Sequence, residues 1–290
     1  MDKMLSVVLP AYNEEQMIKK TAQVVGDLLE KEQIPYELVF VNDGSKDHTW
    51  EKILELKEER AHIKGVCFSR NFGKEAALYA GLERAKGDYV ITMDVDLQDP
   101  PYLIPKMIRC IEEENYDSVA TRRVTREGEP VIRSFFARQF YKLINKISDS
   151  NIVDGARDFR MMKRKMVDAI LTMPEYNRFT KGIFGWVGFE TKWLEYKNVE
   201  RAAGETKWSF WKLFRYACEG IMAFSTAPLM AVSLMGVFVC IFVIFISDIC
   251  NRESCSIWRS RCRMAVISMY YQFFKWYSIV RNGSCWYVSI

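Results

Sequence analysis

Strand-like and helix-like segments alternate regularly through the first 125 residues, and this pattern constrains the fold more than any other feature. The strand-like runs are "LSVVLP", "YELVFVND", "IKGVCFS", "DYVITMD" and "YDSVAT". Charged stretches with a helical period separate them, at 14–31, 46–60, 73–86 and 101–115. This spacing predicts a mainly parallel sheet covered by helices on both faces. In such sheets the ligand crevice lies at the carboxyl ends of the strands.

Polar residues stand directly after these strands, where ligand-binding side chains are expected. They are Asn13 and Glu14, Asp43 with Gly44, Arg70 and Asn71, and Asp94 and Asp96. Each of these signals is weak by itself, because Asp-Gly is common turn chemistry and acids that end a strand are often solvated.

The stretch "ITMDVDLQDPP" concentrates Asp94, Asp96 and Asp99 within six positions, with no lysine between them. Carboxylates this close raise each other's proton affinity unless a cation offsets them. A solvated loop is one explanation. The other is a hard divalent ion, Mg²⁺ or Mn²⁺, bound by Asp94, Asp96 and the neutral oxygen of Gln98 together with phosphate oxygens of a ligand.

A second class of segment lies near the C-terminus. Residues 226–247 carry no charge, and "LMAVSLMGVFVCIFVIFI" would form a helix about 27 Å long, close to the hydrocarbon thickness of a bilayer. A membrane span is therefore predicted, with a buried core helix as the alternative. The preceding "KWSFWKLFRYACEGIMAFS" sets Trp208 and Trp211 beside Lys207 and Lys212, which suits a helix lying in the membrane interface; a core helix is again the alternative.

Composition excludes several other classes of protein. The 290 residues allow one large domain or two smaller ones, and the formal charge of +4 is not gathered into a basic block, which argues against nucleic acid as a partner. The eight cysteines include no CxxC pair, so reduced thiols and a cytosolic main domain are expected. The N-terminal "MDKMLSVVLP" does not read as a signal peptide.

Taken in order, "VVLPAYNEE", "VNDGS", "RNFGKEAALYAGLERAKGD" and "DVDLQDPP" resemble the nucleotide-sugar-binding domain of glycosyltransferase family two, which has the GT-A fold. The motifs "FYKLINKIS", "DFRMM", "KGIFGWVGF" and "RAAGETKWSFWKLFRYACEGIMAFST" are similar to the branch that loads sugar onto a polyprenyl phosphate. That branch includes bactoprenol glucosyltransferases and dolichol-phosphate mannose synthases. The bactoprenol type is nearer, because it also carries a C-terminal membrane anchor. The resemblance covers roughly residues 4 to 246.

The resemblance implies an α/β fold with a GT-A nucleotide-sugar-binding domain, a mainly parallel sheet, interfacial helices and a C-terminal transmembrane anchor. The implied parts are a nucleotide-sugar-binding part at 1–125, an acceptor-side part at 126–205, an amphipathic interfacial helix at 206–226, a transmembrane helix at 227–247 and an atypical tail at 248–290. A marginal second span, interrupted by Lys275, is predicted at 264–280.

The resemblance also implies roles for individual residues. On the donor side, Pro10, Tyr12 and Glu14 would line the nucleoside pocket, and Asp43 would accept a hydrogen bond from the base. Asp94, Asp96 and Gln98 would hold the metal that bridges the donor diphosphate, which makes Asp96 a catalytic residue. Arg201 would meet the diphosphate or the sugar, with Lys207 nearby.

On the acceptor side, Asp158 matches the position usually proposed as the catalytic base. The acceptor is a phosphate monoester with a second pKa of about 6, so it needs little proton abstraction at neutral pH. Orientation of a basic residue or of the sugar, or a structural pairing of Asp158 with Arg157 or Arg160, therefore stays open. The residues Arg122, Arg126 and Arg133 are candidates to hold the acceptor phosphate, with solvated surface charges as the alternative.

After Ser247 the sequence departs from the family pattern. The segment "SDICNRESCSIWRSRCR" carries four arginines and three cysteines, and on the far side of a span those arginines would oppose the positive-inside tendency. A change of reading frame and a diverged tail are both compatible with this composition.

The expected activity is that of an inverting, metal-dependent hexosyltransferase at the cytosolic face of the cell membrane. Its expected partners are a nucleotide sugar, with UDP-glucose favoured, and a polyprenyl phosphate such as undecaprenyl phosphate; a homo-oligomer stays open. The alternatives are a family-two transferase with another lipid or a glycan as acceptor, and a non-catalytic membrane relative that only binds nucleotide sugar. Residue types alone do not separate glucose from other hexoses, or uridine from guanosine.

Overall fold

The computed structural model describes residues 3–123, 155–173, 178–196 and 220–252, together with positions 139, 145–146, 175, 218, 267–268, 270–272 and 274–275. Internal contacts divide the chain into two compact units, Met1–Ser225 and Thr226–Ile290. The two units are described separately below.

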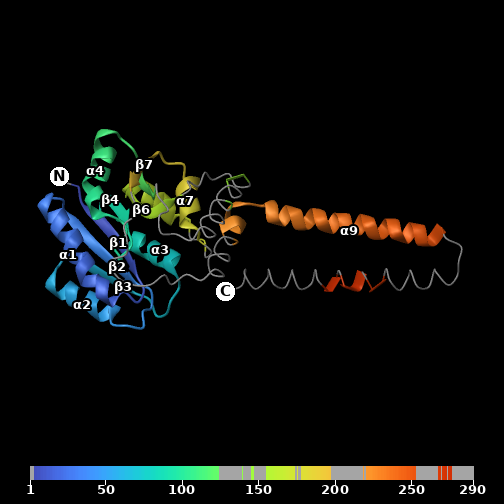
Figure 1. The fold of residues 1–290 in the computed structure, drawn as a ribbon, viewed down its shortest axis with the longest axis horizontal. Helices are drawn as coiled ribbons and strands as arrows, with labels where there is room; N and C mark the ends of the chain where they lie inside the picture. Colours follow the sequence, from blue (N-terminus) through green and yellow to red (C-terminus); the bar gives the residue numbers. More distant parts are fainter. Residues whose placement is uncertain are drawn as a thin grey trace. The chain divides into compact units, whose positions relative to one another are not determined.

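The described part of the first unit is built on a seven-stranded sheet with the order β3-β2-β1-β4-β6-β5-β7 (Figure 1). Its strands are β1 (Leu5–Ala11), β2 (Tyr36–Asn42), β3 (Ile63–Cys67), β4 (Tyr89–Thr92), β5 (Ser118–Arg123), β6 (Ala156–Lys163) and β7 (Thr191–Tyr196). Strands β1 to β5 are the five predicted from the sequence. The predicted α/β fold with a mainly parallel sheet is thus confirmed.

The strand pairing adds one feature that the alternation pattern does not predict. Strands β3, β2, β1 and β4 pair in parallel, as expected. Strand β5 does not lie beside β4, because β6, which contains "DFRMM", is inserted between them and runs antiparallel to both. Strand β7 then pairs in parallel with β5. Since β6 runs against β4, the beginning of β6 lies beside the carboxyl end of β4.

Helices cover both faces of this sheet. They are α1 (Glu15–Lys31), α2 (Thr49–Glu59), α3 (Lys74–Arg84), the 3-10 turn η1 (Pro101–Leu103) with α4 (Ile104–Glu113), α6 (Arg164–Leu171) and α7 (Thr180–Trp186). In α1 the buried residues Ile18, Ala22, Val25 and Leu29 recur at spacings of three and four, which puts them on one side of the helix. Figure 1 shows α1 and α2 on one side of β1–β3 and α3 on the other.

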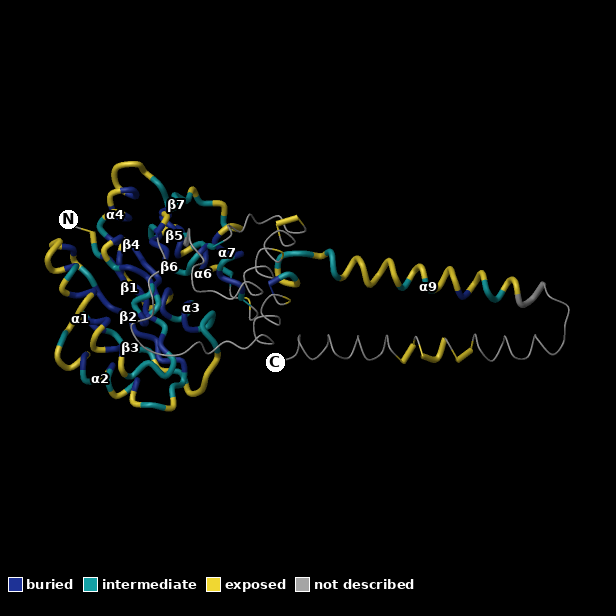
Figure 2. The backbone as a smooth tube through the Cα atoms, viewed as in Figure 1, coloured by how far each residue is buried: buried dark blue, intermediate teal, exposed yellow. Residues whose placement is uncertain are grey.

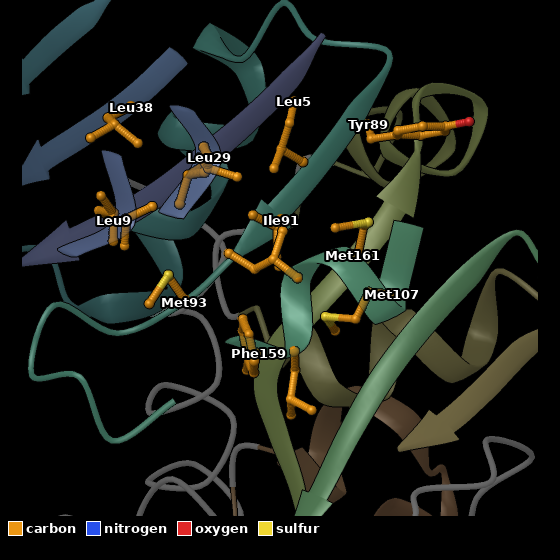
Figure 3. Close-up of a cluster of buried hydrophobic side chains, with 14 of the residues drawn as sticks. Leu5, Leu9, Leu29, Leu38, Tyr89, Ile91, Met93, Met107, Phe159 and Met161 are labelled. Atoms are coloured by element: carbon orange, nitrogen blue, oxygen red, sulfur yellow. The ribbon is translucent and has the colours of Figure 1, made fainter. Parts of the chain in front are cut away.

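Alternation along the strands sends side chains to separate cores on the two faces of the sheet. In β1, Leu5 and Leu9 pack on the side of α1, whereas Val8 packs with Leu82 of α3 on the opposite side. Figure 3 shows the first core, where side chains from β1, β4 and β6 meet those of α1 and α4. Strands β1, β2 and β4 are buried on both faces, which explains why their sequences are largely apolar instead of alternating.

The second unit contains α9 (Ala227–Arg252). Residues Ala227–Ile249 have a mean hydropathy of 3.0 and form, in the described part of the chain, a helix long and apolar enough to cross a membrane. Its side chains are largely exposed within the unit, as the yellow stretches of Figure 2 show. The described residues between 267 and 275, within the predicted second span, are helical; the rest of that segment, and residues 206–217 of the predicted interfacial helix, lie outside the described residues.

Candidate active site at the carboxyl ends of the strands

The loops that follow β1 and β2 are joined by reciprocal hydrogen bonds. The Asn13 amide donates to Ser45 Oγ at 2.9 Å, and the Lys46 amide donates back to Asn13 Oδ1 at 2.8 Å. The Glu14 amide donates to Thr49 Oγ1 at 2.9 Å. Asn13 has a φ of 53°, a left-handed conformation that asparagine tolerates better than most residues. These bonds fix the segment that carries the predicted nucleoside-pocket residues.

The three predicted pocket residues of this segment, Pro10, Tyr12 and Glu14, are each half-buried. Pro10 belongs to β1, opposite Val41 of β2. Tyr12 and Glu14 follow β1 directly, at the strand ends where the crevice is expected. Their side chains are thus placed by β1 and the loop that follows it, and their contact with a nucleoside stays a prediction.

Asp43 connects the turn after β2 to the loop before α3. Its Oδ1 accepts from the Phe72 amide at 2.7 Å, and its Oδ2 accepts from the Gly73 amide at 3.0 Å. The carboxylate is only 4% exposed, and burial raises its pKa although the two amides oppose the shift. Its predicted hydrogen bond to the base of a nucleotide stays a prediction, since each carboxylate oxygen accepts more than one bond.

Gly44 is required in this turn for two reasons. Its φ is +62°, and a Cβ at this position would lie 2.2 Å from the backbone carbon of Arg70. The Asp-Gly pair therefore brings the loops after β2 and β3 into direct contact, beyond forming a local turn.

The acids of "DVDLQDPP" occupy three different environments. Asp99 is 1% exposed; it accepts from the Asp94 amide at 3.1 Å and from the Tyr196 hydroxyl at 3.3 Å. Burial raises its pKa, with Arg157 acting in the opposite direction. Asp96 accepts from the Gln98 amide at 3.1 Å. Asp99 thus holds the loop from inside, Asp96 is buried as well, and Asp94 is the more exposed of the three acids.

Asp94 and Asp158 meet at Lys74, the first residue of α3. The ammonium Nζ lies 2.6 Å from Asp94 Oδ1 and 2.6 Å from Asp158 Oδ2. Asp158 is brought to this place by the antiparallel pairing of β6 with β4, in which Thr92 lies opposite Arg160. The hydroxyl of Thr92 also donates to the main-chain carbonyl of Asp158. The pairing partner of Asp158 is therefore Lys74, and not Arg157 or Arg160 as considered from the sequence.

This ion-pair cluster shifts the pKa values of its members. Burial alone would raise the pKa of Asp158, but the charges of Lys74 and then Lys181 hold it well below its usual value. Burial alone would lower the pKa of Lys74, but Asp158 and Asp94 outweigh it and raise the pKa. Asp158 and Lys74 are thus both charged at neutral pH.

The two arginines of β6 point to opposite faces of the sheet. Arg157 lies 3.5 Å from Asp99 Oδ1 and 4.0 Å from Asp94 Oδ2, and its Nη2 donates to Gln98 Oε1 at 3.4 Å. Arg160 donates to Ser118 Oγ and Thr191 Oγ1, and its guanidinium lies over the ring of Phe184. Arg157 therefore contacts the loop formed by residues 93–99, which we call the acid loop. Arg160 is a buried structural residue.

The predicted metal ligands lie in the loop that follows β4. Asp94, Asp96 and Gln98 offer two carboxylates and an amide oxygen within five positions, a hard donor set that suits Mg²⁺ or Mn²⁺. In the described residues, however, no group of three or more acidic, histidine or cysteine side chains is arranged to hold a metal. Lys74 and Arg157 instead compensate the charge of Asp94. The oxygen ligands of Asp94, Asp96 and Gln98 fit a divalent ion. This ion would share Asp94 with the side chains of Lys74 and Arg157.

The remaining predicted site residues fall into two groups. Arg122, on β5, has a side chain that is 43% exposed and forms an ion pair with Glu195 of β7. Arg126, Arg133, Arg201 and Lys207 lie outside the described residues.

Sequence reasoning missed Lys74 and Lys181 as members of the site. Lys74 follows the loop after β3, and so its position at a strand end was the available signal. Lys181 lies in α7, far from Asp158 in sequence, and nothing in its local pattern distinguishes it from a surface lysine.

A comparison with protein families places this arrangement in a known group. The model described as "Glycosyl transferase family 2" matches residues 6–171, a range that spans β1 to β6. The chain is 43% identical over 235 residues to the bactoprenol glucosyl transferase of Shigella phage SfV, covering 81% of this chain and 76% of that protein. It is also 43% identical over 235 residues to the prophage bactoprenol glucosyl transferase homolog of Escherichia coli K12, with the same coverage.

The solved structures agree at the level of the fold. The crystal structure of glucosyl-3-phosphoglycerate synthase from Mycobacterium tuberculosis, in complex with Mn²⁺, UDP-glucose and phosphoglyceric acid, superposes with a TM-score of 0.51 at 19% identity, covering 76% of this chain and 78% of that one. The match supports the GT-A fold predicted from the sequence. By its sequence motifs, its family match and its relatives, this chain belongs to glycosyl transferase family 2.

Proposed function

We propose that this glycosyltransferase moves a hexose from a nucleotide sugar to a polyprenyl phosphate at the membrane, with UDP-glucose as donor and undecaprenyl phosphate as acceptor. The observation that carries the proposal is the convergence of Asp94 and Asp158 on Lys74 at the strand ends. The names of the two bactoprenol relatives support the acceptor and the glucose. The UDP-glucose and Mn²⁺ bound to the M. tuberculosis enzyme support the class of donor.

The donor would bind along the loops after β1, β2 and β4. In this proposal Pro10, Tyr12, Glu14 and Asp43 face the nucleoside, and Arg201 with Lys207 meets the diphosphate or sugar. Asp94, Asp96 and Gln98 would hold Mg²⁺ or Mn²⁺, which neutralises the donor diphosphate and stabilises the departing nucleoside diphosphate.

Lys74 is suited to bind a phosphate oxygen between the nucleotide sugar and the acceptor lipid. Its ammonium has three N–H donors, so it can keep Asp158 as a counterion while it donates to a phosphate oxygen. An attacking oxygen of the acceptor phosphate forms the new bond to the anomeric carbon. The bond from that carbon to the donor diphosphate breaks, and the nucleoside diphosphate leaves with the electron pair, so a direct displacement inverts the configuration.

The role of Asp158 follows from its charge state. An efficient general base has a pKa near the operating pH, whereas the pKa of Asp158 is held well below its usual value. The acceptor phosphate, with a second pKa of about 6, is itself largely dianionic. We therefore assign Asp158 the task of orienting Lys74. Placement of the phosphate and stabilisation of the leaving group supply the main rate enhancement.

The proposed acceptor is a membrane lipid, so the transfer must take place at the membrane surface. Helix α9 is the proposed anchor, with the catalytic unit on the cytosolic side. The acceptor phosphate would be held by Arg122, Arg126 and Arg133.

The test uses the full-length protein purified in detergent, with undecaprenyl phosphate, Mg²⁺ or Mn²⁺, and radiolabelled UDP-glucose. UDP-galactose and GDP-mannose are run in parallel, and an EDTA arm tests the metal. Label that moves into the organic phase from UDP-glucose alone, and only with metal, is the expected result. The anomeric configuration of the product, read by NMR coupling constants, tests inversion.

Two other outcomes would overturn parts of the proposal. Transfer to a glycan or to another lipid, with undecaprenyl phosphate inactive, would replace the acceptor. Metal-dependent binding of nucleotide sugar without transfer to any acceptor would identify a binding protein that has lost the reaction.

A further inference from the structure

Helix α7 brings a second lysine, Lys181, to the candidate site. The residue is half-buried. In the described part of the chain, its ammonium takes part in no ion pair and no hydrogen bond. A partly buried charge is normally paired, because leaving water costs free energy that only a partner offsets. Lys181 therefore has an ammonium group that is available to an anionic ligand.

The packing of α7 on β6 sets the direction of Lys181. The guanidinium of Arg160 lies 4.4 Å from the ring centroid of Phe184. Asp158 and Arg160 are two positions apart on β6 and so share one face of the sheet. Lys181 and Phe184 are three positions apart on α7 and so share one side of the helix. The side of α7 that carries Lys181 thus faces the side of β6 that carries Asp158.

The beginning of α7 is anchored beside Asp158. The Thr180 amide donates to Glu75 Oε2 at 2.9 Å, and the Thr180 hydroxyl donates to the same oxygen. Glu75 follows Lys74 on α3, and the ammonium of Lys74 lies 2.6 Å from Asp158 Oδ2. In agreement with this placement, burial raises the pKa of Asp158 but the charges of Lys74 and then Lys181 outweigh it. Lys181 therefore lies next to Asp158 without pairing with it.

Two lysines thus approach one carboxylate, and they differ in how they are engaged. Lys74 is shared between Asp158 and Asp94. Lys181 has no carboxylate within ion-pair distance among the described residues. Ammonium groups are strong phosphate ligands because their hydrogen bonds are charge-assisted. A phosphate that accepts from both lysines would use the charge of Lys181, and Asp158 would keep Lys74 in place.

We propose that Lys181 is a ligand of the acceptor phosphate and acts together with Lys74 across Asp158. The assignment rests on the proposed function, which makes the acceptor a phosphate monoester. Each lysine donates to one phosphate oxygen, and a third oxygen forms the bond to the anomeric carbon. The nucleoside diphosphate leaves with the electron pair of the broken bond, so neither lysine has to exchange a proton. Lys181 thus places the attacking oxygen.

The assignment is tested by calorimetric binding of farnesyl phosphate to the full-length protein in detergent. Mn²⁺ and UDP are present in every titration, so that the donor side is filled and no transfer takes place. Farnesol, which has the same chain without the phosphate, measures the contribution of the chain alone. Lys181→Gln is expected to raise the Kd of farnesyl phosphate about tenfold, the effect of losing one charge-assisted hydrogen bond, and to leave farnesol binding unchanged.

Two further variants separate the charge of Lys181 from its place in the fold. Lys181→Arg keeps the cation and is expected to restore the binding of farnesyl phosphate. Lys165→Gln is the matched control, because Lys165 is an exposed lysine of α6 that pairs with Asp117 at 2.6 Å. Its Kd is expected to equal that of wild type. Equal losses of farnesyl phosphate, farnesol and UDP binding in Lys181→Gln would overturn the assignment, since Lys181 would then only hold α7 in place.

The donor diphosphate is the other source of phosphate oxygens near Lys181. The Kd of UDP-glucose is therefore measured in the same variants and is expected to stay unchanged. In transfer assays, KM for undecaprenyl phosphate is expected to rise about tenfold in Lys181→Gln. A weaker binding of UDP-glucose together with unchanged binding of farnesyl phosphate would overturn the assignment and move Lys181 to the donor.

The wild-type protein separates this inference from the proposed function. If wild type bound farnesyl phosphate no better than farnesol, the proposed acceptor would be overturned, and the assignment of Lys181 with it. If wild type bound farnesyl phosphate and Lys181→Gln bound it equally well, the assignment of Lys181 alone would be overturned.

Discussion

The two halves of the sheet prepare the candidate site in different ways. In the half formed by β3, β2, β1 and β4, loops are shaped by hydrogen bonds between backbone amides and side chains, as at Asn13 and Asp43. In the half formed by β6, β5 and β7, charged side chains reach inward, as Arg157 does toward Asp99 and Asp94. The loops of the first half are therefore held mainly by amide hydrogen bonds, and the second half adds Arg157 and Asp158 to the charges of Asp94 and Lys74.

The halves meet at the border between β4 and β6. There Asp94 follows β4, Asp158 lies in β6, and Lys74 neutralises both. The protein itself thus compensates the charge of Asp94 in the acid cluster predicted from the sequence. A cation from α3 already joins the two halves.

The largest effect is expected from the acid loop of the first half. Asp96→Asn should lower transfer by about a hundredfold to a thousandfold, the range found when a single group that stabilises the transition state is removed. The measurement is kcat/KM for sugar transfer with Mn²⁺. Asp168→Asn, at an exposed position of α6, is the control and should keep wild-type activity. A fully active Asp96→Asn protein would remove the metal assignment.

The contact between the halves is broken by Lys74→Met. Asp94 and Asp158 would then lie close together without their shared cation, which should cost about 1–3 kcal/mol in the free energy of unfolding. Transfer should fall as well, because the proposed phosphate ligand is lost. Urea denaturation and kcat/KM give the two numbers.

Lys52→Met is the matched control for that experiment, since Lys52 forms an exposed ion pair with Glu55. Its loss should change stability by less than about 1 kcal/mol. If Lys74→Met were as stable and as active as this control, the ion pairs of Lys74 would contribute neither to stability nor to sugar transfer.

The pH dependence of the unfolding free energy, compared between wild type and Asp158→Asn, tests the charge state of Asp158 at the border between the halves. The folded-state pKa of Asp158 is lowered, so its ionised form stabilises the fold. This stabilisation is fully present above the unfolded pKa of about 3.9 and is lost as the pH falls toward the folded pKa. The difference in unfolding free energy between wild type and Asp158→Asn should therefore be constant from pH 8 to about 5 and should shrink below about pH 4.

The same measurement distinguishes an orienting group from a base. A difference that already changed between pH 7 and pH 5 would mean that Asp158 titrates near neutrality. That result would support proton abstraction in place of the orientation of Lys74.

The smallest effect is expected at the outer edge of the second half. Arg122→Gln removes an exposed ion pair with Glu195 and should change stability by less than about 1 kcal/mol. If Arg122 holds the acceptor phosphate, KM for undecaprenyl phosphate should rise about tenfold, the effect of losing one charge-assisted hydrogen bond. Glu195→Gln breaks the same ion pair but keeps the arginine, so its KM should stay at the wild-type value. Equal KM values for both variants would leave Arg122 a structural residue.

Much of the first half was predictable because its signals are local. Strands β1 to β4 follow from short apolar runs, and α1 to α4 from the helical period of the stretches between and after them. The positions of Asp43, Asp94 and Asp96 at the crevice follow from a general property of parallel sheets, in which the strand ends share one edge. The apolar character of α9 is likewise a property of its own residues.

The second half depends on pairings that no local pattern encodes. The segment "DFRMM" is a family motif in the sequence, but its insertion between β4 and β5 is decided by which neighbours bury both of its faces. That insertion brings Asp158 to Lys74.

The sequence by itself determined the α/β class, the strand ends that carry the acids and the apolar helix, because each depends on the period or composition of a contiguous segment. Only the tertiary structure decided the strand order and the bridge through Lys74. These features join residues far apart in the chain, and their energies depend on distances and burial that exist only after folding.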